Sequence, residues 1–112
     1  MEKKILIIDD EVDFCLIMKL YFLNKGYKVS IASTLQDGLS KLKNDQPHIL
    51  FLDNNLPDGN GWDSIGHIVE LIPQVRAYLV SAHRNYSPLN KNNANIVVWE
   101  KPISMEMLNN IF

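Results

Sequence analysis

Residues 48–61, HILFLDNNLPDGNG, join an apolar run to a turn-rich loop through one acidic residue, Asp53. The run from His48 to Leu52 consists of β-formers without polar alternation, which favours a strand covered on both faces, as in a parallel sheet. Turn formers follow Asp53, so the strand must end there. Ligands of open α/β sheets bind just beyond the carboxyl ends of the strands, and Asp53 is therefore the candidate chemical centre. An Asp that only caps a loop would leave the same local pattern.

The composition describes a globular domain with a hydrophobic core. The chain has 112 residues, of which 46% are apolar, and a formal net charge of −2. We expect a single domain over residues 1–112, without the basic surface that binding to nucleic acid or an anionic membrane requires. No apolar run approaches the ~18 residues of a membrane-spanning helix. No signal peptide precedes the first predicted strand, so a cytoplasmic location is the default expectation.

Cysteine and histidine do not form a spaced metal-binding cluster in this sequence. Cys15 is the one cysteine, and it cannot form an internal disulfide. The three histidines, His48, His67 and His83, are scattered along the chain. A zinc site of the usual Cys and His type is therefore not expected.

Strand and helix patterns alternate along the chain. Short apolar runs predict strands at residues 4–8, 28–32, 48–52, 75–80 and 96–99. Helical spacing or helix-start signals predict helices at 12–25, from Ser33 or Thr34 to about 44, at 62–71 and after Ser104. Five Asn residues leave 83–95 as a short or irregular helix or a loop. The alternation predicts an α/β fold: a doubly wound, five-stranded parallel sheet of the flavodoxin-like type, with helices on both faces and a short or irregular fourth helix.

Apolar residues of the first predicted helix fall on two faces. The inner face, expected to bury against the sheet, consists of Phe14, Ile17, Met18, Tyr21 and Phe22. Leu16, Leu20 and Leu23 stand at i, i+4 and i+7 on a different face, which leaves them facing solvent. This leucine stripe is either tucked against neighbouring helices or a docking surface for a helical partner.

Polar residues stand at the ends of four predicted strands. Asp9 and Asp10 follow the first strand, Asp53 follows the third, Ser81 follows the fourth and Lys101 follows the fifth. The carboxyl ends of parallel strands share one edge of the sheet, so we expect these side chains to meet. Taken singly, each has an ordinary explanation as a loop cap, a strand-end hydroxyl or a solvated charge.

The expected cluster has the composition of a site for phosphoryl chemistry. Three carboxylates brought together repel one another, and their pKa values rise unless a cation lies between them. Hard oxygen ligands with room left for water suit Mg²⁺. A Lys and a Ser hydroxyl beside that cation suit a transferring phosphoryl group, whose oxygens need positive charge and hydrogen-bond donors. One carboxylate could then act as the nucleophile and form an acyl phosphate.

Four motifs give the sequence a family resemblance. They are ILIIDDE at 5–11, LD followed by LPDGNG within 52–61, LVSA at 79–82 and EKP at 100–102. In this order and at this spacing, over about residues 4–108, the sequence resembles the receiver domain of two-component response regulators. The resemblance implies that Asp53 accepts a phosphoryl group from a histidine kinase or phosphotransfer protein. An output domain or output protein would be a further partner.

The resemblance also implies roles for the residues around Asp53. Asp10 would bind Mg²⁺, or Mn²⁺ in its place, directly, Asp9 would bind it through water, and the backbone carbonyl of Asn55 would complete the site. Lys101 would contact the phosphate, and Ser81, next to Ala82, would swing toward it as the switch hydroxyl. The peptide bond between Lys101 and Pro102 is expected to be cis, which is otherwise rare for X-Pro bonds.

The sequence departs from the family pattern in three places. Val98 stands where a switch aromatic is usual, with Trp99 one position later. The segment 81–101 is about two residues shorter than in the family, so the usual output and dimer surface is not assumed. The last helix stops early, at Phe112, which fits a stand-alone receiver or a piece of a longer chain. Asn55 and His83 lie two positions beyond Asp53 and Ser81, where side chains can flank the phosphoryl group and influence its lifetime.

Three functions are consistent with these patterns. The leading hypothesis is a phosphorylatable signalling switch that changes its own surface and is not a turnover enzyme. A second is a hydrolase with an aspartyl nucleophile, although it would need a second carboxylate close after Asp53, where Asn55 stands. The third is a docking module that keeps the fold without phosphorylation, although every acidic position is present.

Overall fold

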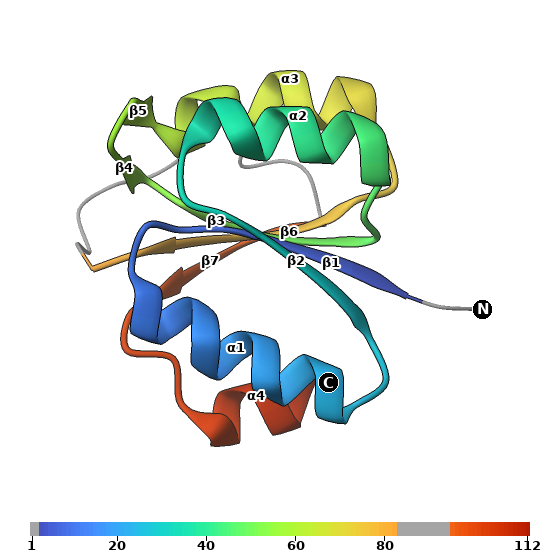
Figure 1. The fold of residues 1–112 in the computed structure, drawn as a ribbon, viewed down its shortest axis with the longest axis vertical. Coiled ribbons are helices and arrows are strands. Elements are labelled where there is room, and N and C mark those ends of the chain that lie inside the picture. Colours follow the sequence, from blue (N-terminus) through green and yellow to red (C-terminus); the bar gives the residue numbers. More distant parts are fainter. Residues whose placement is uncertain (1–2, 83–94) are drawn as a thin grey trace.

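Five parallel strands form the central sheet in the computed structural model, which describes residues 3–82 and 95–112 (Figure 1). The strands are β1 (Lys4–Ile8), β2 (Lys28–Ala32), β3 (Ile49–Asp53), β6 (Arg76–Ser81) and β7 (Ile96–Glu100). Their order across the sheet is β2-β1-β3-β6-β7, and all neighbouring pairs are parallel. The chain runs outward from β1 to β2 and then crosses to β3, so the topological switch point lies between β1 and β3. This arrangement confirms the predicted doubly wound fold.

Helices cover both faces of the sheet. Figure 1 shows α1 (Val12–Asn24) and α4 (Met105–Ile111) on one face, and α2 (Leu35–Asp45) and α3 (Ile65–Leu71) on the other. The helix predicted from residue 62 begins instead with a short 3-10 helix at Gly61–Ser64, and the α-helix starts at Ile65. The irregular helix predicted within 83–95 falls almost entirely on residues 83–94, which are outside the described part of the chain. Among the described helices, none has the length and apolar content to cross a membrane.

Two apolar layers fill the space between the sheet and its helices. All five residues of β3 are buried, as its unbroken apolar run predicts. Alternate β3 side chains enter opposite layers, so that Leu50 and Leu52 pack toward α2 and α3 whereas Ile49 and Phe51 pack toward α1 and α4. The second layer is rich in aromatic rings, which meet edge to face, tilted or, in the pair Phe51 and Tyr78, stacked: Phe22, Tyr27, Phe51, Tyr78, Trp99 and Phe112.

The faces of α1 agree with the prediction except at one position. Met18, Tyr21 and Phe22 are buried, and Phe14 is partly buried. Ile17, predicted to be buried, is 57% exposed, and Cys15 is buried. The contact of α1 with the sheet follows the line of Cys15, Met18 and Phe22, and Ile17, one residue and about 100° from Met18 around the helix, falls outside it. The leucine stripe is exposed as predicted, at 53% for Leu16, 59% for Leu20 and 46% for Leu23.

Side-chain caps fix the starts of two helices. Thr34 Oγ1 accepts a hydrogen bond of 3.1 Å from the Asp37 amide, which identifies Thr34, and not Ser33, as the cap of α2. Ser104 Oγ accepts one of 3.1 Å from the Met107 amide, as predicted for the last helix. Between β3 and α3 the turn-rich loop forms a small antiparallel pair, β4 (Asn55–Leu56) with β5 (Gly59–Asn60), which the turn formers alone did not predict.

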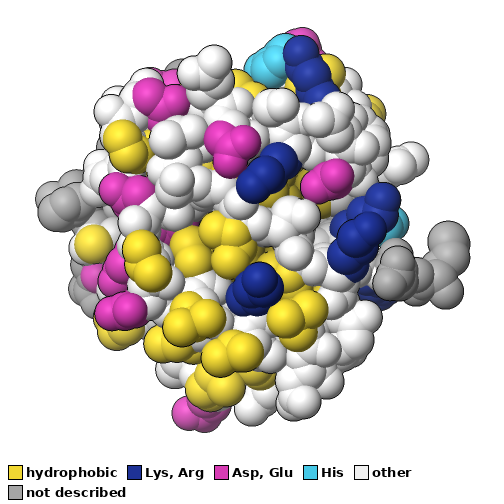
Figure 2. Space-filling view, viewed as in Figure 1, with side chains coloured by type: hydrophobic (Ala, Val, Ile, Leu, Met, Phe, Trp, Pro, Cys, Tyr) yellow, Lys and Arg dark blue, Asp and Glu magenta, His cyan; other side chains and the backbone are white. Residues whose placement is uncertain are grey.

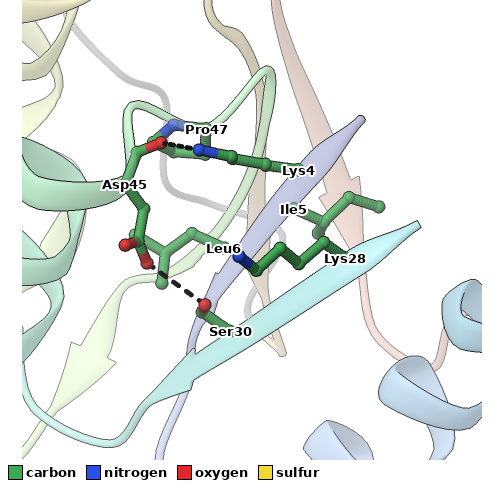
Figure 3. A pocket seen from close by; sticks show the side chains of 7 residues that line it. All are labelled: Lys4, Ile5, Leu6, Lys28, Ser30, Asp45 and Pro47. Carbon is green, nitrogen blue, oxygen red and sulfur yellow. Dashed lines mark hydrogen bonds between the residues drawn. The ribbon is translucent and has the colours of Figure 1, made fainter. Parts of the chain in front are cut away.

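Helix α2 packs on β1 and forms hydrogen bonds to β1 and β2 along its length. Gly38 packs directly on the side chain of Ile8, and Lys41 Nζ donates to the carbonyl of Ile31. At the helix end, Asp45 Oδ2 accepts a 3.2 Å hydrogen bond from Ser30 Oγ and its carbonyl accepts one of 3.2 Å from Lys4 Nζ. Figure 3 shows the two hydrogen bonds of Asp45 beside a small pocket at the amino-terminal ends of β1 and β2. They hold α2 in a fixed place on the sheet.

The contact of Gly38 with Ile8 predicts opposite effects of alanine at two glycines. A Cβ on Gly38 would lie 2.5 Å from Ile8 Cδ1 in the core, so Gly38→Ala should lower the free energy of unfolding by about 1–3 kcal/mol. Gly66 in α3 has open space around it, so Gly66→Ala should raise the free energy of unfolding by about 0.5 kcal/mol. Urea denaturation of both variants measures the difference. A neutral Gly38→Ala would contradict the close approach of α2 to β1.

Candidate functional site

The carboxyl ends of four strands bring most of the predicted site residues to one edge of the sheet. Asp9 follows β1, Asp53 ends β3, Ser81 ends β6 and Lys101 follows β7. Asp9, Asp53 and Ser81 are buried, at 2%, 5% and 2% exposure. Their common location follows from the strands being parallel and next to one another, so that successive ends point the same way.

Three carboxylates converge at this edge. One oxygen from each of Asp9, Asp10 and Asp53 lies within 4.8 Å of the other two, and only Asp10 is exposed. Burial raises the pKa of Asp53 to about 6, and the negative charge of Asp9 adds to this effect. Burial also raises the pKa of Asp9, although the Glu11 amide donates a 2.9 Å hydrogen bond to its Oδ1. The folded chain therefore holds acidic groups where ionisation is costly.

Lys101 supplies the positive charge that balances these carboxylates. Its Nζ lies 2.9 Å from Asp9 Oδ2, 2.9 Å from Glu11 Oε1 and 4.0 Å from Asp53 Oδ1. The same ammonium stands 4.5 Å from the centre of the Phe14 ring. Burial alone would lower the pKa of Lys101, but the hydrogen bonds to Asp9 and Glu11 raise it above its ordinary value. Lys101 therefore stays protonated at neutral pH.

The loop after Asp53 is held by Asn54 and Gly61. The buried Asn54 accepts a 2.9 Å hydrogen bond from the Gly61 amide on its carbonyl and one of 3.2 Å from the Trp62 amide on its Oδ1. A Cβ on Gly61 would overlap the carbonyl oxygen of Asp53, so this position requires glycine. Asn55, whose carbonyl is a predicted metal ligand, is exposed at the start of β4.

The remaining predicted residues within 3–82 and 95–112 lie at or near this edge. Ala82 follows Ser81 and is exposed. Val98 and Trp99 point to opposite faces of β7: Val98 is 47% exposed, whereas the Trp99 ring is buried 4.7 Å from that of Tyr78. Trp99 is thus a core residue of the layer under α1 and α4. His83 lies outside the described residues.

Two backbone and side-chain features complete the surroundings of Asp9 and Lys101. The peptide bond between Lys101 and Pro102 is cis, as the family resemblance implies. The buried thiol of Cys15 donates a 3.3 Å hydrogen bond to the carbonyl of Asp9. Burial, followed by the charge of Asp9, raises the pKa of Cys15 to about 11. This thiol therefore links α1 to the backbone of Asp9, beside the acidic cluster.

Sequence reasoning missed two acidic residues. Glu11 stands in the motif ILIIDDE without an assigned role, yet it shares Lys101 with Asp9. Asp58 accepts hydrogen bonds on both carboxylate oxygens from the amides of Leu35 and Gln36 at the start of α2. The motif could have drawn attention to Glu11, whereas the Asp58 contacts span 22 and 23 residues and have no local signal.

The oxygen atoms of the cluster fit a hard divalent cation. Asp9 Oδ2 is buried and accepts no hydrogen bond of regular geometry from the described residues, although the Lys101 ammonium lies 2.9 Å away. The ion pair with Lys101 leaves lone pairs of this oxygen unused, and carboxylate oxygens of Asp9, Asp10 and Asp53 lie within 4.8 Å of one another. Carboxylate oxygens are the ligands that Mg²⁺ prefers in proteins.

Comparison with known protein families points to one class of signalling domain. A family model described as the response regulator receiver domain matches residues 5–111. The response regulator SaeR of Staphylococcus aureus strain USA300 is 39% identical over 61 residues, which cover 54% of this chain and 26% of that protein. The match therefore spans about a quarter of the length of this curated relative.

Solved structures show the same fold over nearly the whole chain. A crystal structure of a CheY-like response regulator receiver domain protein from Methanospirillum hungatei JF-1 has a TM-score of 0.87 at 27% identity, covering 99% of this chain and 91% of that chain. A two-component response regulator from Clostridium difficile has a TM-score of 0.85 at 26% identity, covering 97% and 91%.

The raised pKa of Asp53 predicts that its charge destabilises the metal-free protein. The carboxyl has a pKa of about 6 when folded and an ordinary value of 3.8, so its stabilising contribution is present below pH ~4 and is lost as the pH rises through 6. Asp53→Asn, which mimics the neutral carboxyl, should raise the free energy of unfolding by about 2–3 kcal/mol at pH 7.5. The gain should disappear near pH ~4.

Urea denaturation of both proteins in EDTA, at the two pH values, measures this difference. Equal free energies of unfolding at pH 7.5 would show that the folded protein tolerates the Asp53 charge without cost.

Proposed function

Because this chain belongs to the response regulator receiver domain family, we propose that it is a signalling switch in which Asp53 accepts a phosphoryl group from a phosphohistidine. The observation that supports this assignment most directly is the position of Asp53 between Asp9, Asp10 and Lys101 at the edge of the sheet. Asp53 is the carboxylate that ends the central, fully buried strand β3. A histidine kinase or phosphotransfer protein would supply the phosphoryl group.

The proposed reaction is a phosphoryl transfer from nitrogen to oxygen. An ionised Asp53 oxygen attacks the phosphorus, an O–P bond forms, and the N–P bond of the phosphohistidine breaks. The bonding electrons of the N–P bond stay with the imidazole, which takes up a proton. Lys101 is 4.0 Å from Asp53 Oδ1, within reach of a phosphoryl oxygen there, and Ser81 can donate a hydrogen bond to the same group.

Asp9, Asp10, Asp53 and the backbone carbonyl of Asn55 would hold Mg²⁺, or Mn²⁺ in its place. When bound, this cation would neutralise the carboxylates and draw charge from the phosphoryl oxygens. Lys101 alone places one positive charge among three carboxylates. We expect Lys101 to release Glu11, whose side chain is 57% exposed, when it contacts the phosphoryl group.

A hydrolase with an aspartyl nucleophile is less consistent with the site. Such an enzyme needs a free carboxylate close after the nucleophile to act as acid and base. The second position after Asp53 is Asn55, and both carboxylate oxygens of Asp58 accept hydrogen bonds from α2. A docking module that is not phosphorylated would not require the buried carboxylates of Asp9 and Asp53 or their pairing with Lys101.

Labelling by a small phosphodonor tests the phosphoacceptor assignment. With Mg²⁺ and acetyl phosphate, the protein should form one phosphoryl adduct per chain, seen as a mass increase in intact-protein mass spectrometry. Asp53→Asn should abolish the adduct, and Asp10→Ala should weaken Mg²⁺ binding by about tenfold or more, because a carboxylate ligand is lost. Undiminished labelling of the Asp53→Asn protein would refute the assignment, and continuing turnover of acetyl phosphate without an adduct would favour a hydrolase.

The exposed apolar face of α1 is the proposed docking surface for the phosphodonor. It consists of Val12, Leu16, Ile17, Leu20 and Leu23, which are between 46% and 78% exposed. Figure 2 shows hydrophobic side chains gathered on the side of the molecule where α1 lies. The helix starts two residues after Asp10, so a helical partner on this face would lie beside the acidic cluster. A helical hairpin of a histidine kinase or phosphotransfer protein has the matching shape.

Charge substitutions on α1 separate donor docking from chemistry. Leu16→Glu with Leu20→Glu should leave the fold and the acetyl phosphate adduct intact, because both side chains are about half exposed. Transfer from a phosphorylated donor protein should fall by at least about tenfold, since docking would bury the new charges. His67→Glu, which adds charge on the exposed face of α3 across the sheet, is the control and should transfer normally. Unimpaired transfer to the α1 variant would exclude this face.

A further inference from the structure

Asp58 joins the loop after Asp53 to the start of α2. Its Oδ1 accepts a 2.7 Å hydrogen bond from the Leu35 amide, and its Oδ2 accepts one of 2.9 Å from the Gln36 amide. The third amide of the helix, that of Asp37, donates to Thr34. The first turn of a helix cannot satisfy these amides internally, so two side chains, one local and one remote, complete it. The two donors hold the pKa of Asp58 below its usual range.

Helix α2 is a fixed support for this contact. Gly38 lies against Ile8, the residue directly before Asp9, and Asp45 is bonded to Lys4 and Ser30 at the other end of the helix (Figure 3). The helix is therefore attached to β1, the strand that delivers Asp9 and Asp10. A group bonded to the start of α2 is held in place relative to these two carboxylates.

The loop itself is a short, closed unit. β4 and β5 pair Asn55 with Asn60 and Leu56 with Gly59, and Asp58 lies in the turn between them. At its base, the Gly61 amide donates to the carbonyl of Asn54. Asn55 is three residues before Asp58 in this unit. The base follows β3, and near its tip the Asp58 carboxylate accepts hydrogen bonds from the first two amides of α2.

We propose that Asp58 is a positioning residue, which fixes the β4–β5 loop and the Asn55 carbonyl relative to Asp9 and Asp10 by bonding to α2. This inference rests on the proposed function, because it makes Mg²⁺ affinity depend on a side chain that is not itself a ligand. Residues that orient metal ligands from outside the coordination sphere have measurable effects on affinity. Without the Asp58 contact, the loop would keep its base but lose the bond that sets its position against β1.

Three variants of the full chain test the role of Asp58. Asp58→Ala removes both acceptors, and Asp58→Asn keeps one acceptor oxygen without the charge. Thr34→Ala is the matched control, since it removes a cap from the same turn of α2 without touching the loop. Far-UV circular dichroism and urea denaturation establish that each variant folds. Hydrogen exchange reports on the Leu35 and Gln36 amides, and isothermal titration calorimetry with MgCl₂ gives the Mg²⁺ affinity.

The expected results distinguish positioning from general destabilisation of α2. Asp58→Ala should lower the Mg²⁺ affinity about tenfold, with faster exchange of the Leu35 and Gln36 amides. Asp58→Asn should lose less, and Thr34→Ala should stay within about twofold of the unaltered protein, because the loop contact remains. If the unaltered protein binds Mg²⁺ and Asp58→Ala binds it equally well, or Thr34→Ala loses as much, this inference fails alone. If the unaltered protein binds no Mg²⁺, the proposed function fails and this inference falls with it.

Discussion

The burial of two carboxylates against a single ammonium is the constraint on which the rest of this molecule depends. Asp9 and Asp53 are almost wholly buried at the ends of β1 and β3, and Lys101 is the cation that reaches both. Isolated ions of this kind would be expelled from a protein interior or neutralised by a proton. Here β1 and β3 hold the carboxylates in place, and the raised pKa of Asp53 reflects the cost of burying its charge. A site with an excess of negative charge favours groups that bring positive charge.

Both helix layers contact the chain close to this site. β1 and β3 are neighbours in the sheet, and their ends carry the acidic residues. On one face, α2 packs on Ile8, which directly precedes Asp9, and its first amides donate hydrogen bonds to Asp58 in the loop after Asp53. On the other face, the Phe14 ring of α1 lies against the Lys101 ammonium. One helix layer therefore contacts the residue before Asp9 and the loop after Asp53, and the other contacts Lys101.

The sequence was sufficient for the fold and for the meeting of Asp9, Asp10, Asp53 and Lys101, because unbroken apolar runs identify parallel strands and topology brings their ends together. It was insufficient where a contact depends on rotation or on distant partners. Periodicity could not decide that α1 buries Cys15 and exposes Ile17, since both lie near the edge of its apolar face. Nothing local to Asp58 shows that Leu35 and Gln36 are its partners, and nothing local to Glu11 shows that it shares Lys101.

The environment of Cys15 lowers the reactivity of its thiol. Cys15 lies on the buried side of α1, its thiol donates a hydrogen bond to the carbonyl of Asp9, and burial raises its pKa to about 11. Oxidants and alkylating agents attack the thiolate, which is scarce at such a pKa. The residue next to the acidic cluster is thus insulated from redox chemistry while the chain is folded. Unfolding would return the thiol to ordinary reactivity, so oxidation of Cys15 would mark chains that have unfolded.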